Sequence, residues 1–271
     1  RCQGNIDTFL KEQNIIGIHS IDTRCLTRII REAGVMNGVI TTENVYEKKD
    51  ELLKQINEYK ITDAVKSVTN PETRTYGSED HKYKVALFDF GYKRNIRNEL
   101  VNRGCEVIVV PADTTAEQIK EIAPDGIMFS NGPGDPSENT EVIKNIREIA
   151  QLGIPIFGIC LGHQLMALAH GATTQKLKYG HRGANQPVID KALGKTFVTS
   201  QNHGYAVVGE SMDPEIGEVS HINANDGTCE GMRYKNINAF TVQFHPEAHG
   251  GPQDTAYLFD EFIDMIKKEM H

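Results

Sequence analysis

The chain has 271 residues, of which 39% are hydrophobic and 24% are charged, and its formal net charge at pH 7 is −8. This length allows one large domain or two modest ones, and the composition excludes a disordered polymer. The acidic balance without a basic cluster argues against a nucleic-acid partner, and no apolar run approaches the roughly 18 residues that span a bilayer.

The first part of the chain, residues 1–47, contains short mixed elements. Asp22 is a suitable N-cap for a helix over Thr23–Ile30, and Gly34 is a suitable terminator. The apolar face of that helix comprises Leu26, Ile29 and Ile30. Because the first residue is Arg rather than Met, we expect the sequence to be part of a longer gene product.

Residues 48–82 are polar and contain turn signals such as Asn70-Pro71, which favours a connecting segment. The predicted organisation is therefore part of a smaller N-terminal domain over residues 1–47, a connection over 48–82 and a larger domain over 83–271.

From about Tyr83 the pattern changes to an alternation of strands and helices. Stretches with helical spacing, such as the one containing Ile96 and Leu100, separate four apolar runs. These runs are Val85–Phe90, Val107–Val110, Gly126–Phe129 and Ile154–Phe157. The alternation predicts an α/β fold with a parallel sheet covered by helices on both faces. Ligands bind at the carboxyl ends of the strands in such sheets.

Beyond Gly171 the chain becomes richer in β-branched residues and turns, which predicts an antiparallel extension of the sheet. A final helix is expected near Thr255–Lys268, because apolar residues recur there at helical spacing. Its stripe comprises Leu258, Phe262, Ile263 and Ile266.

The five cysteines are odd in number and far apart, and none forms a C-x-x-C pair. This argues against a disulfide framework or a zinc knuckle and fits a reducing, cytoplasmic setting. Cys105 falls in a predicted strand and Cys229 in a predicted turn, so neither has the setting of a nucleophile.

Cys160 stands at the centre of the stretch FGICLGHQ, residues 157–164. Gly158 and Gly162 flank it in the G-x-nucleophile-x-G spacing of a strand-to-helix elbow, where a neighbour with a Cβ would clash. Leu161–His170 has helical spacing, so Cys160 would lie at a helix N-terminus, where backbone dipoles favour a thiolate. The alternative interpretation is a buried structural thiol in a tight turn.

A nucleophilic cysteine needs a base, and the base needs an orienting acceptor. The best candidate among the ten histidines is His245, which with Glu247 follows the strand pattern of residues 240–244. Pro246 fixes φ between them and would hold the two side chains in one relative geometry. The alternative interpretation is a surface turn.

Three other patterns carry little weight. Residues 245–249 superficially resemble a zinc motif, but Pro246 stands where the helix should continue, so no metal site is expected. Asp89-Phe90-Gly91 matches the kinase tripeptide without its companion motifs. The chain also lacks a G-x-x-x-x-G-K-[ST] phosphate loop, so no nucleotide site is predicted.

Together, FGICLGHQ, the Asn131–Gly134 loop and the FHPE segment at residues 244–247 resemble the class I, triad-type glutamine amidotransferase family. The likeness covers about residues 83–268. Within that family the chain is most similar to the small, glutaminase subunits of carbamoyl-phosphate synthetases. Three stretches carry this narrower likeness: GHRGANQPV at 180–188, QNHGYAV at 201–207, and the segment from Asp22-Thr23-Arg24 to Asn37-Gly38. The last segment resembles the end of the small subunit's N-terminal domain.

The resemblance implies a role for each matching residue. Cys160 would attack the glutamine amide to give a γ-glutamyl thioester and ammonia, His245 would act as base and then as acid, and Glu247 would orient the imidazole. The backbone N–H groups of Leu161 and Gly132 would form the oxyanion hole. The residues expected to hold glutamine are Gly132, Gly134, Leu161, Gln164, Asn202, Gly204 and Tyr205. Tyr205 is a mild departure, since phenylalanine is familiar at that position.

The same resemblance implies the partner and the wider reaction. Ammonia would pass through an interior tunnel to a large synthetase subunit, where ATP and Mg²⁺ are expected; no cofactor is expected on this chain. The product would be carbamoyl phosphate, which feeds arginine and pyrimidine synthesis.

Two rival interpretations remain. The chain could instead be the glutaminase of an anthranilate or aminodeoxychorismate synthase, although the leading segment and GHRGANQPV argue against this. It could also be a binding module that has the fold without catalysis.

Overall fold

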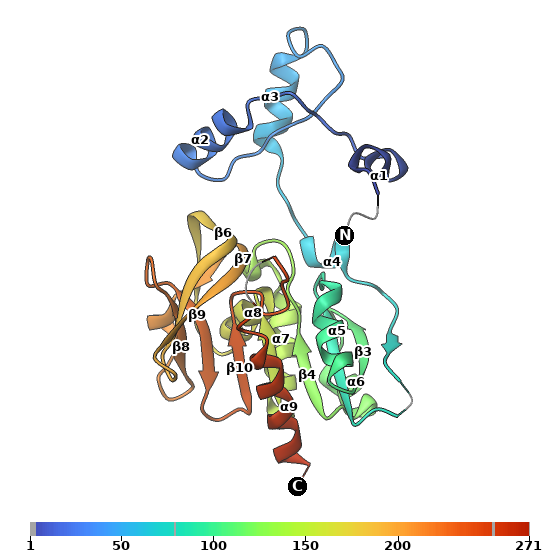
Figure 1. Ribbon diagram of the computed structural model, residues 1–271, viewed down its shortest axis with the longest axis vertical. Coiled ribbons are helices and arrows are strands. Elements are labelled where there is room, and N and C mark those ends of the chain that lie inside the picture. Colours follow the sequence, from blue (N-terminus) through green and yellow to red (C-terminus); the bar gives the residue numbers. More distant parts are fainter. Residues whose placement is uncertain (1–3, 79, 251–252, 271) are drawn as a thin grey trace. The chain divides into compact units, whose positions relative to one another are not determined.

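The computed structural model of the protein describes residues 4–78, 80–250 and 253–270 (Figure 1). The chain divides into two compact units, Arg1–Ile61 and Thr62–His271. The division falls inside the predicted connecting segment 48–82, whose residues contribute to both units. Cys2 lies outside the described residues.

The first unit contains three helices among its described residues: α1 (Ile6–Glu12), α2 (Thr23–Ala33) and α3 (Lys49–Glu58). Helix α2 begins where its cap predicts, because the Asp22 carboxylate accepts the backbone N–H of Cys25 at 2.8 Å. It ends at Gly34, whose φ is +89°. The apolar face of α2 is not buried within this unit, and Ile29 is 49% exposed.

The second unit is built on a ten-stranded sheet with the order β1-β3-β2-β4-β5-β10-β9-β8-β6-β7. Its parallel half comprises β2 (Tyr83–Asp89), β3 (Cys105–Pro111), β4 (Gly126–Phe129), β5 (Ile156–Ile159) and β10 (Ala239–Val242), with β1 (Arg74–Tyr76) as an antiparallel edge. The antiparallel extension comprises β6 (Thr174–Asp190), β7 (Lys195–Val207), β8 (Gly217–Asn223) and β9 (Cys229–Tyr234). The predicted α/β fold with its antiparallel extension is confirmed.

Helices cover both faces of the parallel half, as Figure 1 shows. One face packs against α5 (Arg94–Asn102) and α9 (Tyr257–Glu269); the other packs against α6 (Ala116–Ile122), α7 (Thr140–Ile149) and α8 (Leu161–Ala169). Short helices complete the unit: α4 (Ala64–Val68), η1 (Pro136–Glu138), η2 (Ala150–Leu152) and η3 (Gly209–Ser211).

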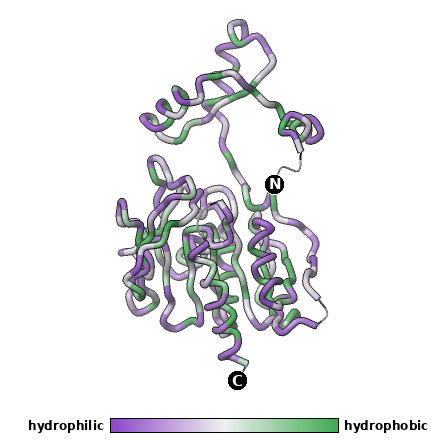
Figure 2. Tube along the Cα trace, in the orientation of Figure 1, coloured by the Kyte–Doolittle hydropathy of each residue, from purple (hydrophilic) through white to green (hydrophobic). Residues whose placement is uncertain are grey.

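Strand β2 explains why this sheet is buried on both sides. Val85 and Leu87 belong to the core on one face, and Ala86 and Phe88 belong to the core on the other, because successive side chains alternate across a strand. Figure 2 shows the apolar character of these central strands. Burying each large side chain contributes about 1.5–3 kcal/mol, so the two cores fix the strands on which the functional loops begin.

Two sequence-based expectations differ from the structure in detail. The fourth predicted strand, Ile154–Phe157, is shifted to Ile156–Ile159, because β10 pairs with residues 156–159 and Pro155 has no N–H to donate. Cys229 begins strand β9 rather than lying in a turn. None of the helices in the described part of the chain combines the length and apolar character that a membrane crossing requires.

Candidate active site

Cys160 lies at the corner between β5 and α8. Its backbone has φ +54° and ψ −103°, and its N–H donates to the carbonyl of Val242 on β10 at 2.8 Å. A non-glycine residue in such a conformation costs on the order of 1–3 kcal/mol, and it persists only where the surrounding structure holds it. The side chain is 4% exposed and lines a pocket.

Close packing of α8 on the sheet explains the glycine at position 162. A Cβ there would lie 2.4 Å from the backbone oxygen of Phe129, so the first turn of α8 touches β4 directly. Gly158 is similarly enclosed, with Thr241 Cγ2 2.8 Å from the position of a Cβ. The two glycines therefore bring the Cys160 corner against both neighbouring strands.

His245 and Glu247 follow β10, the strand that pairs in parallel with β5. His245 Nδ1 lies 2.8 Å from Glu247 Oε1, and both side chains are almost completely buried. Because Nδ1 faces Glu247, Nε2 is the ring nitrogen left for the sulfur of Cys160, with which His245 also forms a hydrogen bond. The structure thus brings the three predicted triad residues together.

The charges in this group support one another. Burial alone would lower the pKa of His245, but the charge and hydrogen bond of Cys160, together with Glu247, raise it to about 9. Burial would raise the pKa of Glu247, yet the hydrogen bond and charge of His245 and the charge of Lys93 lower it. Glu247 is therefore ionised and can stabilise an imidazolium during a reaction.

Lys93 is a neighbour of the triad that the sequence analysis missed. Its Nζ lies 3.3 Å from His245 Nδ1 and 3.7 Å from Glu247 Oε1. Lys93 follows β2 by a short loop, and the carboxyl ends of parallel strands are where functional residues gather. Its place after a buried strand was therefore a usable signal, but the kinase-like tripeptide before it carried no weight by itself.

The pocket beside Cys160 has a volume of about 500 Å³. Eight of the residues predicted for the site line it: Cys160, His245, Gly132, Gly134, Gln164, Asn202, Gly204 and Tyr205. Glu247 does not line it because it lies behind His245, and the Leu161 side chain is buried in the core. Residues that were not predicted also line it: Val68, Gly91, Lys93, Asn131, Pro133, Arg182 and His203.

Two backbone N–H groups lie where an oxyanion hole requires them. A Cβ on Gly132 would lie 2.6 Å from Leu161 Cδ2 and 2.2 Å from the backbone oxygen of Phe90, so the Gly132 backbone packs directly against Leu161. Within residues 4–78, 80–250 and 253–270, neither N–H group donates to another protein atom. Both donors are therefore available to a ligand.

Two of the predicted substrate-holding side chains are themselves held in place. Gln164 Nε2 donates to the Tyr205 carbonyl at 2.8 Å and to Gln243 Oε1 at 2.9 Å. The Tyr205 hydroxyl hydrogen-bonds with Asp135, and burial together with that carboxylate raises the pKa of Tyr205 to about 12. The hydroxyl that distinguishes this tyrosine from phenylalanine therefore has a partner on the opposite loop.

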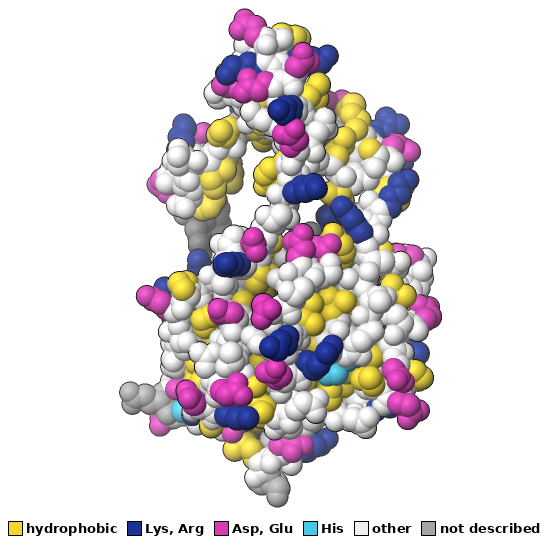
Figure 3. Space-filling view, turned by 180° about the vertical axis from the view of Figure 1, so that it is seen from behind, with side chains coloured by type: hydrophobic (Ala, Val, Ile, Leu, Met, Phe, Trp, Pro, Cys, Tyr) yellow, Lys and Arg dark blue, Asp and Glu magenta, His cyan; other side chains and the backbone are white. Residues whose placement is uncertain are grey.

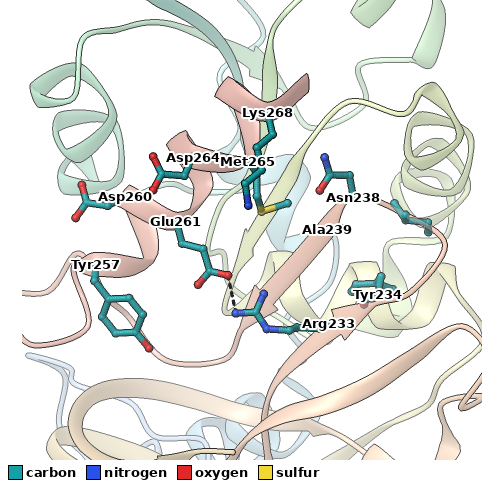
Figure 4. A pocket seen from close by; sticks show the side chains of 11 residues that line it. Arg233, Tyr234, Asn238, Ala239, Tyr257, Asp260, Glu261, Asp264, Met265 and Lys268 are labelled. Atoms are coloured by element: carbon teal, nitrogen blue, oxygen red, sulfur yellow. Dashed lines mark ion pairs between the residues drawn. The ribbon is translucent and has the colours of Figure 1, made fainter. Parts of the chain in front are cut away.

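A second pocket of about 530 Å³ lies between α9 and strands β9 and β10 (Figure 4). It contains an ion pair between Arg233 and Glu261 at 2.6 Å. It begins at Ala239, the amino end of β10, and none of the predicted site residues lines it. The surface drawn in Figure 3 carries acidic and basic side chains intermixed.

Comparison with known proteins identifies the relatives of this chain. The family model "Glutamine amidotransferase class-I" matches residues 86–265, and the model "Carbamoyl-phosphate synthase small chain, CPSase domain" matches residues 1–40. The carbamoyl phosphate synthase small chain of Bacillus cereus (strain ATCC 10987 / NRS 248) is 49% identical over 267 residues, which are 98% of this chain and 72% of the relative.

Two further proteins extend the comparison. The carbamoyl phosphate synthase pyrimidine-specific small chain of Bacillus subtilis (strain 168) is 49% identical over 268 residues, again 98% of this chain and 72% of the relative. A solved structure of Thermoplasma acidophilum, described as belonging to a GMP synthase, has a TM-score of 0.62 at 22% identity, over 70% of this chain and 96% of that one, and shows the shared fold. This chain belongs to the carbamoyl phosphate synthase small-chain family of the class I glutamine amidotransferases.

Proposed function

We propose that this chain hydrolyses glutamine to glutamate and ammonia through a cysteine thioester. The observation that carries the proposal is the meeting of Cys160, His245 and Glu247 beside one pocket, although 85 residues separate the cysteine from the histidine along the chain. A thiol, an imidazole and an orienting carboxylate are the parts of a nucleophilic acyl-transfer site.

The geometry assigns a role to each group. His245 accepts the Cys160 proton, and the sulfur forms a bond to the amide carbon of glutamine. The N–H groups of Gly132 and Leu161 stabilise the negative oxygen of the tetrahedral intermediate. The imidazolium then donates its proton to the leaving nitrogen, which departs as ammonia while the thioester forms.

The second half of the reaction reverses these roles. His245 removes a proton from water, and the resulting hydroxide attacks the thioester carbon. The carbon–sulfur bond breaks, glutamate leaves and the proton returns to the cysteine. Glu247 stabilises the imidazolium in both halves, and Lys93 keeps Glu247 ionised.

The proposal includes a large synthetase partner. The relatives' names describe a small chain, and the sequence has no phosphate loop, so ATP and Mg²⁺ belong on another polypeptide. Ammonia delivered to that partner would support ATP-dependent carbamoyl phosphate synthesis for arginine and pyrimidine formation in the cytoplasm, in a heterodimer of small and large chains. No cofactor is needed for the steps assigned to this chain.

Alkylation tests the nucleophile directly. The 271-residue chain is incubated with an electrophilic glutamine analogue, and the modified peptide is identified by mass spectrometry. We expect one adduct, on Cys160, which excess glutamine prevents. Cys25 is an exposed thiol in the same chain and serves as an internal control for non-specific alkylation. An unmodified Cys160 in folded protein would instead favour the binding module without catalysis.

Co-purification tests the partner. We expect a large protein to accompany the chain, and glutamine-dependent carbamoyl phosphate formation to require both. Glutaminase turnover of the chain alone should be weak and should rise on addition of the large chain, because a coupled reaction is gated by its partner. Unchanged turnover would contradict the coupling.

A further inference from the structure

A buried polar cluster lies in the antiparallel extension, outside the proposed triad. It comprises His181 on β6, Gln201 and His203 on β7, and Glu230 on β9. The register pairs His181 with His203, and their ring centroids are 5.0 Å apart. All four residues are at least nine-tenths buried, and Glu230 is completely buried.

The two histidine rings are oriented by acceptors on their outer sides. His181 Nε2 lies 2.8 Å from Asp226 Oδ2, and His203 Nδ1 lies 2.8 Å from the backbone carbonyl oxygen of Tyr205. Each of these nitrogens therefore donates outward in the neutral ring. His181 Nδ1 and His203 Nε2 are left facing inward, 3.0 and 2.9 Å from the same atom, Gln201 Oε1.

Protons alone do not satisfy this cluster when Glu230 is ionised and both rings are neutral. As the Gln201 amide stands, its oxygen faces an unprotonated nitrogen on each ring. Reversing the amide lets it donate to both rings, but His181 Nδ1 then still faces Glu230 Oε1, 3.1 Å away. Protonating His181 relieves that contact and leaves His203 Nε2 facing Gln201 Oε1.

Glu230 adds an independent observation. Its second carboxylate oxygen, Oε2, is buried without a hydrogen-bond partner among the described residues. An uncompensated buried carboxylate oxygen is costly. Every inward-facing atom of the cluster is thus an electron-pair donor, and one of them has no partner at all.

We propose that His181, His203 and Glu230 bind a zinc-type divalent cation, with the Gln201 amide oxygen as an additional ligand. One ligand atom from each of the first three residues lies within 4.8 Å of the others. Tetrahedral zinc with bonds of about 2.0–2.1 Å places its ligands roughly 3.3 Å apart, so the side chains need to move inward only slightly. Two imidazoles and a carboxylate are a typical zinc donor set.

The surroundings of the rings match those of known metal sites. Metal-bound histidines donate their remaining N–H to a carboxylate or a backbone carbonyl, which fixes the ring. Asp226 and the Tyr205 carbonyl supply one acceptor of each kind. The sequence analysis expected no metal site because these residues are far apart in sequence and form no spacing motif.

The cation would join β6, β7 and β9 directly beside the glutamine pocket. His203 stands between Asn202 and Gly204, which line that pocket, and its own side chain lines it as well. The site does not depend on the proposed hydrolysis, because none of its ligands takes part in the triad.

Cobalt binding tests the site. The test uses the metal-stripped 271-residue chain carrying Cys160→Ser, since a thiol beside His245 would compete for the metal. We expect one equivalent of Co²⁺ to bind with the strong visible absorption of a tetrahedral site, and Zn²⁺ to displace it. Thermal unfolding should shift to a higher temperature when Zn²⁺ is added.

Matched variants in the same background locate the ligands. His181→Gln and the near-isosteric Glu230→Gln should abolish saturable binding, and Asp226→Asn should weaken it about 10–100-fold. His19→Gln changes an exposed histidine and should have no effect. Circular dichroism identifies variants that are folded, and Asp226, whose side chain is 46% exposed, provides a substitution that folding tolerates.

Two results would overturn the proposal. One is the absence of one-to-one binding in the stripped protein. The other is binding that survives Glu230→Gln and Asp226→Asn in folded protein. In that case Glu230 and Asp226 simply hold His181 as an imidazolium, and its ring should titrate near pH 9 by NMR whether or not Zn²⁺ is present.

Discussion

In the parallel half of the sheet, β4 and β5 are buried on both faces and carry mainly apolar side chains, whereas the antiparallel extension buries histidines, amides and a glutamate. The two halves also contribute differently to the pocket. Cys160 and His245 follow strands of the parallel half, while Asn202, Gly204 and Tyr205 come from β7 of the extension. Close apolar packing thus positions the reacting groups, and hydrogen bonding positions the groups that contact substrate.

The largest effect is expected from removing the nucleophile of the parallel half. Cys160→Ser should abolish glutamine-dependent synthesis in the complex with the large chain, because serine is a far weaker nucleophile beside the same imidazole. Ammonia-dependent synthesis should persist, since its chemistry is assigned to the partner. Parallel assays with glutamine and with ammonium salts measure both, and an equal loss of both activities would contradict the division of labour.

Gly162→Ala tests whether contact between α8 and β4 holds the reacting corner. The added methyl group would lie 2.4 Å from the Phe129 carbonyl oxygen, so we expect a loss of about 1–3 kcal/mol in the free energy of unfolding and a lower turnover number. Gly171→Ala is the control, because its Cβ would meet no atom within 4 Å, although its φ is +90°. Equal losses in the two variants, measured by urea unfolding, would argue against close packing as the cause.

His163 is an exception in the apolar parallel half and makes its stability sensitive to acid. Its Nδ1 lies 2.8 Å from Thr241 Oγ1, and burial lowers the pKa of His163 to about 3 from its ordinary value of 6.5. The unfolded chain therefore binds a proton that the folded chain does not. Stability is complete above pH 6.5 and falls as the pH decreases towards 3, by about 1.4 kcal/mol per pH unit from this residue.

Urea unfolding between pH 7 and pH 5 measures this dependence. His163→Gln should lose less stability over that interval than the parent protein. His19→Gln, at an exposed position, should follow the parent curve. A His163→Gln curve that is parallel to the parent curve would show that this ring does not carry the dependence.

The smallest effect is expected from Tyr205→Phe in the extension. The ring remains, and only the hydrogen bond to Asp135 is lost, which is worth about 0.5–1.5 kcal/mol. The KM for glutamine should rise by no more than about tenfold while kcat stays within twofold. Tyr257→Phe is the control, because that hydroxyl donates to Asp190 at 3.0 Å and lies outside the pocket. A large fall in kcat for Tyr205→Phe would place the hydroxyl in the reaction itself.

Local patterns in the sequence were sufficient for several features of the fold. The Asp22 cap and Gly34 predicted the ends of α2 within a few residues, because capping is a short-range interaction. The apolar run Gly126–Phe129 has the bounds of β4, since a strand buried on both faces requires apolar residues without interruption. The spacing around Cys160 likewise indicated a corner, because glycine is required where helix and strand touch.

Contacts between distant parts of the chain were decided only by the tertiary structure. Ile159 pairs with Val242, and this register brings the Cys160 corner to the end of the strand that precedes His245. Lys93 reaches the same edge from β2, and His181, His203 and Glu230 meet because β6, β7 and β9 belong to one sheet. Periodicity and turn chemistry act over a few residues and therefore determine elements, whereas the pairing of strands determines which of their ends, and which buried donors and acceptors, come into contact.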